Sequence, residues 1–270
     1  MYRACLLGAL LLAIGGCASN AERIDAQARA AGLTRTVVES DGLPTLIYSN
    51  AEPSDGGRLL VFLEGDGRPW HAGIEPSTDP TTRNPIALQL MLRTPGNAAY
   101  IGRPCYHNLG GERCTSDLWT SARYSEEVVQ AMVNAVQEAA RRANARDIVL
   151  VGYSGGGALA VLLAERLQVV AAVVTIAANL DIEAWTRHHG YLPLDRSLNP
   201  ATSPHAHPWR EIHLLGMRDT TVPPVTADAY FQRYPDAQRW TLDEHGHVCC
   251  WLDAWPTLWQ KIAAALRTAE

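Results

Sequence analysis

This sequence contains very little lysine and phenylalanine, and its net charge is small. Among its 270 residues there are one lysine and two phenylalanines, and 23 basic side chains stand against 28 acidic ones, which gives a formal net charge of −5. The lack of a positive excess or a basic cluster argues against a nucleic-acid partner. With 47% apolar residues, the chain also differs from disordered proteins. Its length is ample for one large hydrophobic core.

The N-terminal apolar run is too short to cross a bilayer. Ala4–Ile14 is a run of eleven residues, whereas a membrane-spanning helix needs about 20. A short apolar run after a basic residue, here Arg3, is typical of a secretory signal. We therefore predict a signal peptide over residues 1–16 and a working chain over residues 17–270.

The end of this signal resembles the bacterial lipobox. The residues are Ile14-Gly15-Gly16-Cys17, and the resemblance implies that Cys17 carries acyl chains such as palmitate. Such chains would anchor the protein in a membrane of the bacterial cell envelope. Ala18 follows the cysteine, and by resemblance to enterobacterial sorting this favours the outer membrane, facing the periplasm. A plain signal peptide with a chance cysteine is the alternative.

Four cysteines then remain in an oxidising compartment. Cys105 and Cys114 flank a short polar, glycine-rich segment, which favours a local disulfide between them. Cys249 and Cys250 are adjacent. They form a vicinal bridge, pair elsewhere or stay reduced, and the sequence does not choose among these.

Strand-like and helix-like segments alternate along the chain. Such alternation predicts an α/β fold with a mostly parallel central sheet and helices on both faces. Thr34–Glu39 and Thr45–Tyr48, separated by the turn Asp41-Gly42, predict an antiparallel N-terminal edge. Further strands are expected at Arg58–Glu64, Ala98–Gly102, Asp147–Val151, Val169–Ala177, Ile212–Leu215 and Arg239–Leu242. Helices are expected at Ile86–Arg93, Ser125–Ala145, Gly155–Leu167, Thr226–Arg233 and Trp255–Thr268.

No interdomain linker interrupts this pattern, so we predict a single domain. The connection Asn179–Trp209 is too long for an ordinary loop between two strands. We interpret it as a small lid.

One motif predicts a nucleophile. Gly152-Tyr153-Ser154-Gly155-Gly156 matches G-x-S-x-G, directly after one predicted strand and at the start of a predicted helix. That strand–turn–helix context is what the motif requires, because the serine stands on a tight turn that only small neighbours permit. The stretch has no P-loop lysine and does not match G-x-G-x-x-G. We expect Ser154 to be a nucleophile, with no cofactor and no metal.

This motif resembles the nucleophile turn of the α/β-hydrolase fold superfamily, whose triad runs Ser, Asp or Glu, then His. Asp219 lies just after a predicted strand in a G-x-x-D-x-x-V-P run, and the resemblance implies that it is the acid; Asp181 is the rival. The resemblance favours His247 as the base, with Trp251 following it, over His245.

An oxyanion hole needs two backbone N–H donors. Gly155, directly after the nucleophile, is the first candidate. The second is Asp66, in the loop Glu64-Gly65-Asp66-Gly67, where related hydrolases often have His-Gly. The Asp66 carboxylate must point away from the anion if the N–H is to serve. Alternatively, Glu64 and Asp66 bind a cationic substrate group or hydrogen-bond the long loop.

Longer strings, including EGDGRPW, GYSGGGALA and HVCCW, resemble an uncharacterised group of bacterial α/β-hydrolase lipoproteins. The resemblance implies a serine hydrolase that acts through an acyl-enzyme on small ester-like substrates. Esters are favoured over peptides and thioesters. Neither an acyl-length preference nor an oligomeric state follows from the sequence.

Two other functions compete with this one. Alternation along an extended segment places His245, His247 and Cys249 on one face, where they would bind a metal ion. The other alternative is a non-catalytic envelope binding protein that keeps the fold. The unusual Glu64-Gly65-Asp66 loop is the best support for that reading.

Overall fold

The computed structural model describes residues 18–52, 56–203 and 208–267. The predicted signal peptide over residues 1–16 and the lipidation at Cys17 lie outside the described residues. Within these ranges, no helix is both long and apolar enough to cross a membrane.

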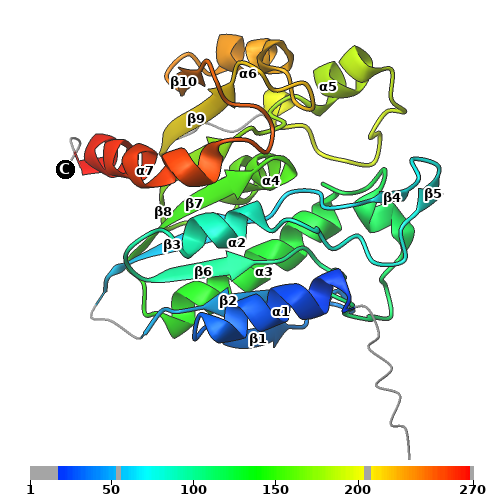
Figure 1. The fold of residues 1–270 in the computed structure, drawn as a ribbon, viewed down its shortest axis with the longest axis vertical. Coiled ribbons are helices and arrows are strands. Elements are labelled where there is room, and N and C mark those ends of the chain that lie inside the picture. The colour runs from blue at the N-terminus through cyan, green and yellow to red at the C-terminus, as the bar shows by residue number, and fades with distance from the viewer. Residues whose placement is uncertain (1–17, 53–55, 204–207, 268–270) are drawn as a thin grey trace, which may run out of the picture.

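One eight-stranded sheet organises the molecule (Figure 1). Its strand order is β1-β2-β6-β3-β7-β8-β9-β10. Strands β6, β3, β7, β8, β9 and β10 all run parallel to one another. Strands β1 and β2 pair antiparallel, and β2 also runs antiparallel to β6. This is the predicted fold class, including its antiparallel N-terminal edge. The strands are β1 (Thr34–Val38), β2 (Thr45–Ser49), β3 (Arg58–Leu63), β6 (Ala98–Ile101), β7 (Asp147–Tyr153), β8 (Val170–Ile176), β9 (Arg210–Gly216) and β10 (Gln238–Leu242).

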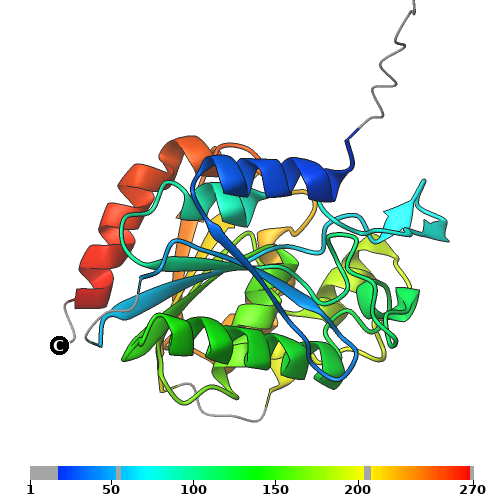
Figure 2. The same ribbon diagram turned by 90° about the horizontal axis from the view of Figure 1, so that it is seen from below.

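Helices cover both faces of the sheet, as Figure 2 shows. On one face lie α1 (Asn20–Ala30), α2 (Ile86–Met91) and α7 (Trp251–Arg267), and on the other lie α3 (Glu126–Arg142) and α4 (Gly155–Ala164). Alternate residues of β3 supply the two cores: Leu60 and Phe62 belong to one, Val61 to the other. Parallel strands buried on both faces read as continuous apolar runs for this reason.

Helix α1 was not among the predicted elements. A capping box starts it, because Ser19 and Glu22 satisfy each other's backbone N–H groups. The helix buries only Ala21, Ile24 and Ala28, and two alanines give a weak apolar signal. The Ser-x-x-Glu spacing was the signal that could have revealed it.

Helix α7 starts at Trp251, four residues before the predicted Trp255. The Trp251 side chain is fully buried. Its indole N–H donates to the carbonyl oxygens of Gly246 and His247. These contacts fix the helix start, so Pro256 lies inside the helix rather than in its first turn.

The segment interpreted as a lid contains a helix, α5 (Ile182–His189). The Trp185 indole N–H donates to the carbonyl oxygen of Thr221 over 2.7 Å, and the His189 ring bonds the same oxygen. In this conformation α5 therefore packs on the loop after β9. Its movement as a lid stays a prediction.

Both cysteine pairs in the described chain are disulfides. Cys105 bonds Cys114 with a Cα–Cα distance of 5.6 Å. Cys249 bonds its neighbour Cys250, which is one of the three states that the sequence left open.

Candidate active site

Ser154 lies on a tight turn between β7 and α4. Its φ is +54°, a left-handed conformation that costs free energy in residues other than glycine. Neighbouring glycines make the turn possible: a Cβ on Gly152 would lie 2.3 Å from the Gly156 carbonyl oxygen. A Cβ on Gly156 would lie 2.3 Å from the Leu63 carbonyl oxygen. The end of β3 is thereby packed against the start of α4.

Three side chains form a continuous hydrogen-bonded chain. His247 Nε2 lies 3.0 Å from Ser154 Oγ, and His247 Nδ1 lies 2.8 Å from Asp219 Oδ2. The other Asp219 oxygen accepts the backbone N–H groups of Thr221 and Val222, each over 2.8 Å. The Asp219 side chain is 1% exposed. The carboxylate is thus fixed toward the imidazole, which is the geometry of a serine nucleophile, base and acid.

His247 itself is held through its main chain. The Tyr153 hydroxyl donates to the His247 carbonyl oxygen over 3.0 Å, and the Trp251 indole donates to the same oxygen. His245 points elsewhere: its ring lies 4.7 Å from the Trp251 ring, and burial lowers its pKa. The structure therefore brings His247, and not His245, to Ser154.

The rival acid, Asp181, has a different position. One of its carboxylate oxygens accepts the backbone N–H groups of Glu183 and Ala184, so it caps the start of α5. The Asn199 amide also donates to that oxygen. Asp181 is therefore a helix cap.

The loop after β3 lies directly against Ser154. A Cβ on Gly65 would be 3.1 Å from the Ser154 Cβ. Neither the Asp66 nor the Gly155 backbone N–H donates a hydrogen bond to another described residue. Both predicted oxyanion donors thus remain available next to the serine.

The Asp66 carboxylate is bound by protein groups. Arg103 donates to Oδ1 over 2.6 Å, Arg123 to Oδ2 over 2.9 Å, and the Tyr124 hydroxyl lies 2.8 Å from both oxygens. Burial alone would raise the pKa of Asp66, but Arg123 and Arg103 hold that pKa below its usual value. Both arginines are themselves buried. Sequence reasoning missed these three partners of Asp66.

Glu64 is also occupied. Its Oε1 accepts the N–H of Gly65 over 3.1 Å and that of Ala87, in the first turn of α2, over 3.5 Å. The side chain is buried, and burial raises its pKa to about 7. Glu64 and Asp66 therefore both bind the protein's own groups, but of these partners only Gly65 belongs to the long loop, so the predicted hydrogen bonding within that loop is found only for Glu64.

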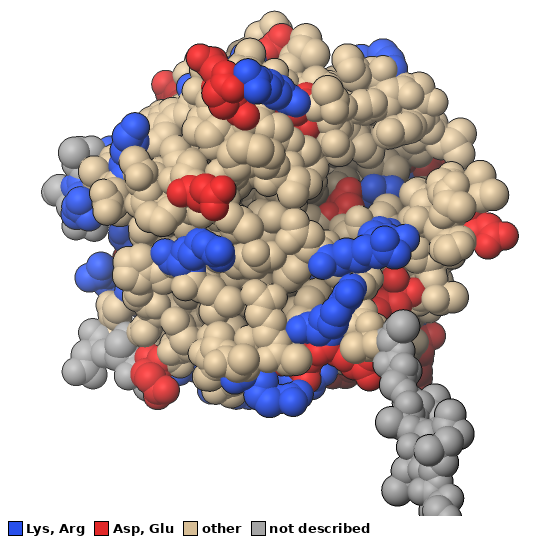
Figure 3. All heavy atoms as spheres, in the orientation of Figure 1, with Lys and Arg blue, Asp and Glu red and all other residues tan. Residues whose placement is uncertain are grey.

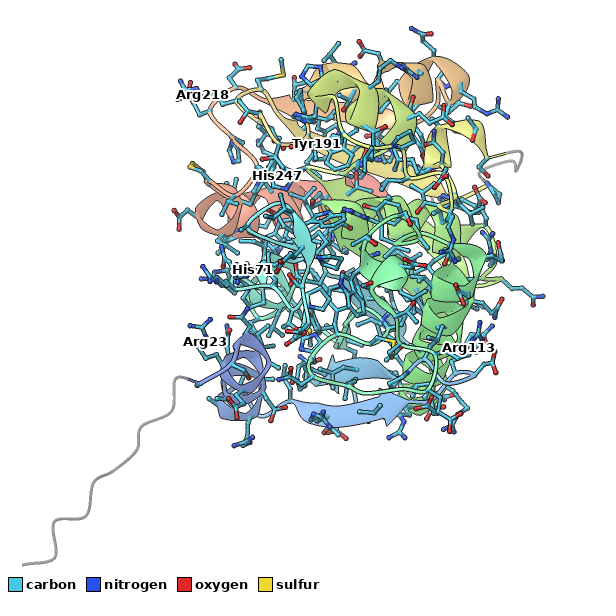
Figure 4. The ribbon with its side chains drawn as sticks, turned by 90° about the vertical axis from the view of Figure 1, so that its right-hand side faces the viewer. Arg23, His71, Arg113, Tyr191, Arg218 and His247 are labelled. Atoms are coloured by element: carbon cyan, nitrogen blue, oxygen red, sulfur yellow. A yellow bond between two sulfur atoms is a disulfide. The ribbon has the colours of Figure 1, made fainter. Side chains whose placement is uncertain are left out.

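The predicted metal ligands are used otherwise. Cys249 is bonded to Cys250, and His247 contacts Asp219 and Ser154. Among residues 18–52, 56–203 and 208–267, no group of three His, Cys, Asp or Glu side chains is placed to hold a metal ion. Figure 4 looks onto this side of the molecule, where His247 lies between Tyr191 and His71 in the view.

Comparison with known proteins identifies the fold. No protein-family model and no curated protein sequence matches the chain. Solved structures do match. An esterase from Pyrococcus furiosus superposes with a TM-score of 0.61 at 13% identity, over 88% of this chain and 92% of the esterase. Est1E from Butyrivibrio proteoclasticus gives 0.56 at 13% identity, over 86% and 98%.

A third match spans part of a longer protein. The acylaminoacyl peptidase from Pyrococcus horikoshii superposes with a TM-score of 0.61 at 12% identity, over 88% of this chain and 42% of the peptidase. At these identities the likeness concerns the fold and not the substrate. The chain has the α/β-hydrolase fold.

Proposed function

We propose that this protein is a serine hydrolase that cleaves carboxylic esters in the bacterial cell envelope. The observation that carries the proposal is the hydrogen-bonded chain from Asp219 through His247 to Ser154. Its support is local geometry: a strained serine turn, an oriented imidazole and a buried carboxylate occur together at one edge of the sheet.

The proposed reaction proceeds through an acyl-enzyme. His247 takes the Ser154 proton as Oγ attacks the substrate carbonyl, and the Gly155 and Asp66 N–H groups stabilise the oxyanion. His247 then passes its proton to the leaving alcohol. Water attacks the acyl-enzyme with His247 as base, which frees the acid and restores Ser154. Asp219 stabilises the imidazolium in both halves of the reaction.

An ester-like small molecule is the proposed substrate. Two of the structural neighbours are an esterase and Est1E, whereas the peptidase match covers only part of its protein. Screening p-nitrophenyl esters of graded acyl length would identify the chain length that fits the site.

Labelling with a fluorophosphonate probe tests the nucleophile. We expect the wild-type protein to be labelled and Ser154→Ala to remain unlabelled, because the probe reacts with an activated serine. Ser197→Ala is the matched control, since Ser197 bonds only main-chain groups near Tyr124, and it should label normally. A folded wild-type protein that does not label would favour the non-catalytic binding protein.

The envelope location is a separate part of the proposal. It is supported by the sequence of residues 1–17, with Cys17 as the lipidated residue facing the periplasm at the outer membrane. Cell fractionation of wild type and Cys17→Ala tests it. After a high-salt wash, which weakens attachment by charge, the variant should leave the membrane fraction while its labelling by the probe is retained, whereas an unchanged distribution would contradict lipid anchoring.

A further inference from the structure

A cavity of about 590 Å³ lies where the described chain begins. It is lined by the start of α1 and by the long loop between β3 and α2, and none of the triad residues belongs to it. Arg23, Arg68 and Arg83 face it together with Ala18, the first described residue, and Asp79.

The walls of this cavity are fixed by hydrogen bonds. The Arg68 N–H donates to the Pro80 carbonyl oxygen over 2.7 Å, so the two arms of the long loop are tied together. The Asn20 amide donates to the carbonyl oxygen of Thr81 over 3.0 Å, which joins α1 to the loop. The arginines therefore project from a defined surface.

Three arginines and one carboxylate, Asp79, line the cavity, so its positive charge is only partly offset. Among the residues that the structure describes, none of the three guanidinium groups forms an ion pair. The carboxylate of Asp79 instead accepts the Thr81 N–H and hydroxyl. At the lower right of Figure 3, on the face where the described chain begins, basic and acidic side chains lie next to one another. In a protein of net charge −5, this local excess indicates an anionic partner.

The same loop presents an exposed hairpin that carries apolar side chains together with His71 and Glu75. Strands β4 (Trp70–His71) and β5 (Glu75–Pro76) form it. Ile74, at its turn, is 77% exposed, and Trp70 is 38% exposed. In Figures 1 and 2 this hairpin and the first residues of α1 lie toward the same side of the molecule.

We propose that the three arginines and the β4–β5 hairpin form a docking surface for a bilayer that contains anionic phospholipid. Guanidinium groups bind phosphate oxygens through paired N–H donors, and Trp and Ile side chains enter the interfacial region. This docking rests on the proposed envelope location: a lipid on Cys17, one residue before Ala18, would bring this surface to the membrane. The docking is independent of the proposed hydrolase reaction.

Vesicle binding of the full chain tests the proposal. Vesicles of phosphatidylcholine alone are compared with vesicles that also contain phosphatidylglycerol, by co-sedimentation. For Arg23→Gln/Arg68→Gln/Arg83→Gln we expect partitioning onto the anionic vesicles to fall about tenfold, and partitioning onto the neutral ones to stay unchanged. The salt dependence of binding should weaken in the same variant.

A control of equal charge separates a site from general electrostatics. Arg93→Gln/Lys261→Gln/Arg267→Gln removes three exposed positive charges outside the cavity and should bind almost as the wild type does. Equal loss in both triple variants would overturn the proposal. Binding of inorganic phosphate by the wild type but not by the triple variant, with equal partitioning of both onto anionic vesicles, would assign the cavity to a soluble anion and also overturn it.

The hairpin is tested in the same assay. Ile74→Ser should weaken binding to both kinds of vesicle. Leu192→Ser removes an apolar side chain that is even more exposed, at 83%, but lies outside the proposed surface, and should have no effect. Unchanged binding of Ile74→Ser would remove the hairpin from the surface. A circular dichroism spectrum and a urea-unfolding midpoint equal to those of the wild type show that each variant is folded.

Discussion

The Asp66 carboxylate lies beside the first residue of α4, near the place where the proposed reaction develops negative charge. A Cβ on Gly155 would be 1.9 Å from Asp66 Oδ1. Arg103 and Arg123 neutralise the carboxylate, which favours the proposed role of the Asp66 N–H toward an oxyanion. The sequence pointed to the Asp66 N–H as an oxyanion donor, but it did not reveal which residues bind the Asp66 carboxylate. The two arginines lie 37 and 57 positions away, and no periodic pattern connects such distant residues.

Glu64 makes folding stability depend on pH. Burial raises its pKa from 4.5 to about 7, so the folded state favours the protonated carboxyl. Its contribution is fully present below about pH 4.5 and is lost as the pH rises through about 7, with a magnitude on the order of 3 kcal/mol. Glu64→Gln keeps an amide oxygen for the Gly65 N–H and cannot ionise. Urea unfolding should show a smaller loss of stability for this variant between about pH 5 and about pH 8.

The matched control for Glu64 is an exposed glutamate. Glu112 is exposed, and Glu112→Gln should reproduce the wild-type dependence of stability on pH. If Glu64→Gln also followed the wild-type curve, the Glu64 carboxyl would not titrate in this range.

At the scale of elements, the contact between the β3 loop and α4 determines which residue can follow the nucleophile. In Gly155→Ala the new methyl group would lie 1.9 Å from Asp66 Oδ1 and 2.5 Å from the Tyr124 hydroxyl. Overpacking of this kind costs about 1–3 kcal/mol, and it would push the Asp66 loop away from Ser154. We expect lower stability in urea and at least about a tenfold slower rate of ester hydrolysis, because one oxyanion donor is displaced.

Gly110→Ala is the control for that substitution. Nothing lies within 4 Å of a Cβ at Gly110, so stability and hydrolysis should both be unchanged. Wild-type behaviour of Gly155→Ala would mean that the β3 loop moves aside freely.

Strands with continuous apolar runs were predicted well from the sequence. Helix α1 and the start of α7, which lack such a pattern, were not. Strands β3 and β7 are continuous apolar runs because both of their faces are covered. Helix α1 has a mostly polar sequence. It is stabilised by its capping box and by packing against β2, and neither gives a strong apolar pattern in the sequence. The start of α7 depends on the indole of Trp251, a contact that helix periodicity does not encode.

At the scale of the whole molecule, the parallel sheet explains why distant residues meet. Ser154 is 93 positions from His247, and Asp219 is 28 positions from it. Each of the three follows a strand of the sheet, and the carboxyl ends of parallel strands gather at one edge. The G-x-S-x-G motif and the resemblance to the α/β-hydrolase triad therefore named residues that the sheet brings together. The pairing of Cys249 with Cys250 could not be predicted in this way, since adjacency permits the bond without requiring it.

The two disulfides should differ in what they contribute to global stability. Cys105 and Cys114 are nine positions apart and close a ring of ten residues, for which the loss of chain entropy in the unfolded state is worth about 2.7 kcal/mol. Cys249 and Cys250 are adjacent, so their bond constrains almost no additional chain. Cys105→Ala/Cys114→Ala should lower the thermal midpoint by about 5–10 °C. Cys249→Ala/Cys250→Ala, the matched control, should lower it much less. The reverse order in calorimetry would show that local packing, and not loop closure, determines how these bonds stabilise the fold.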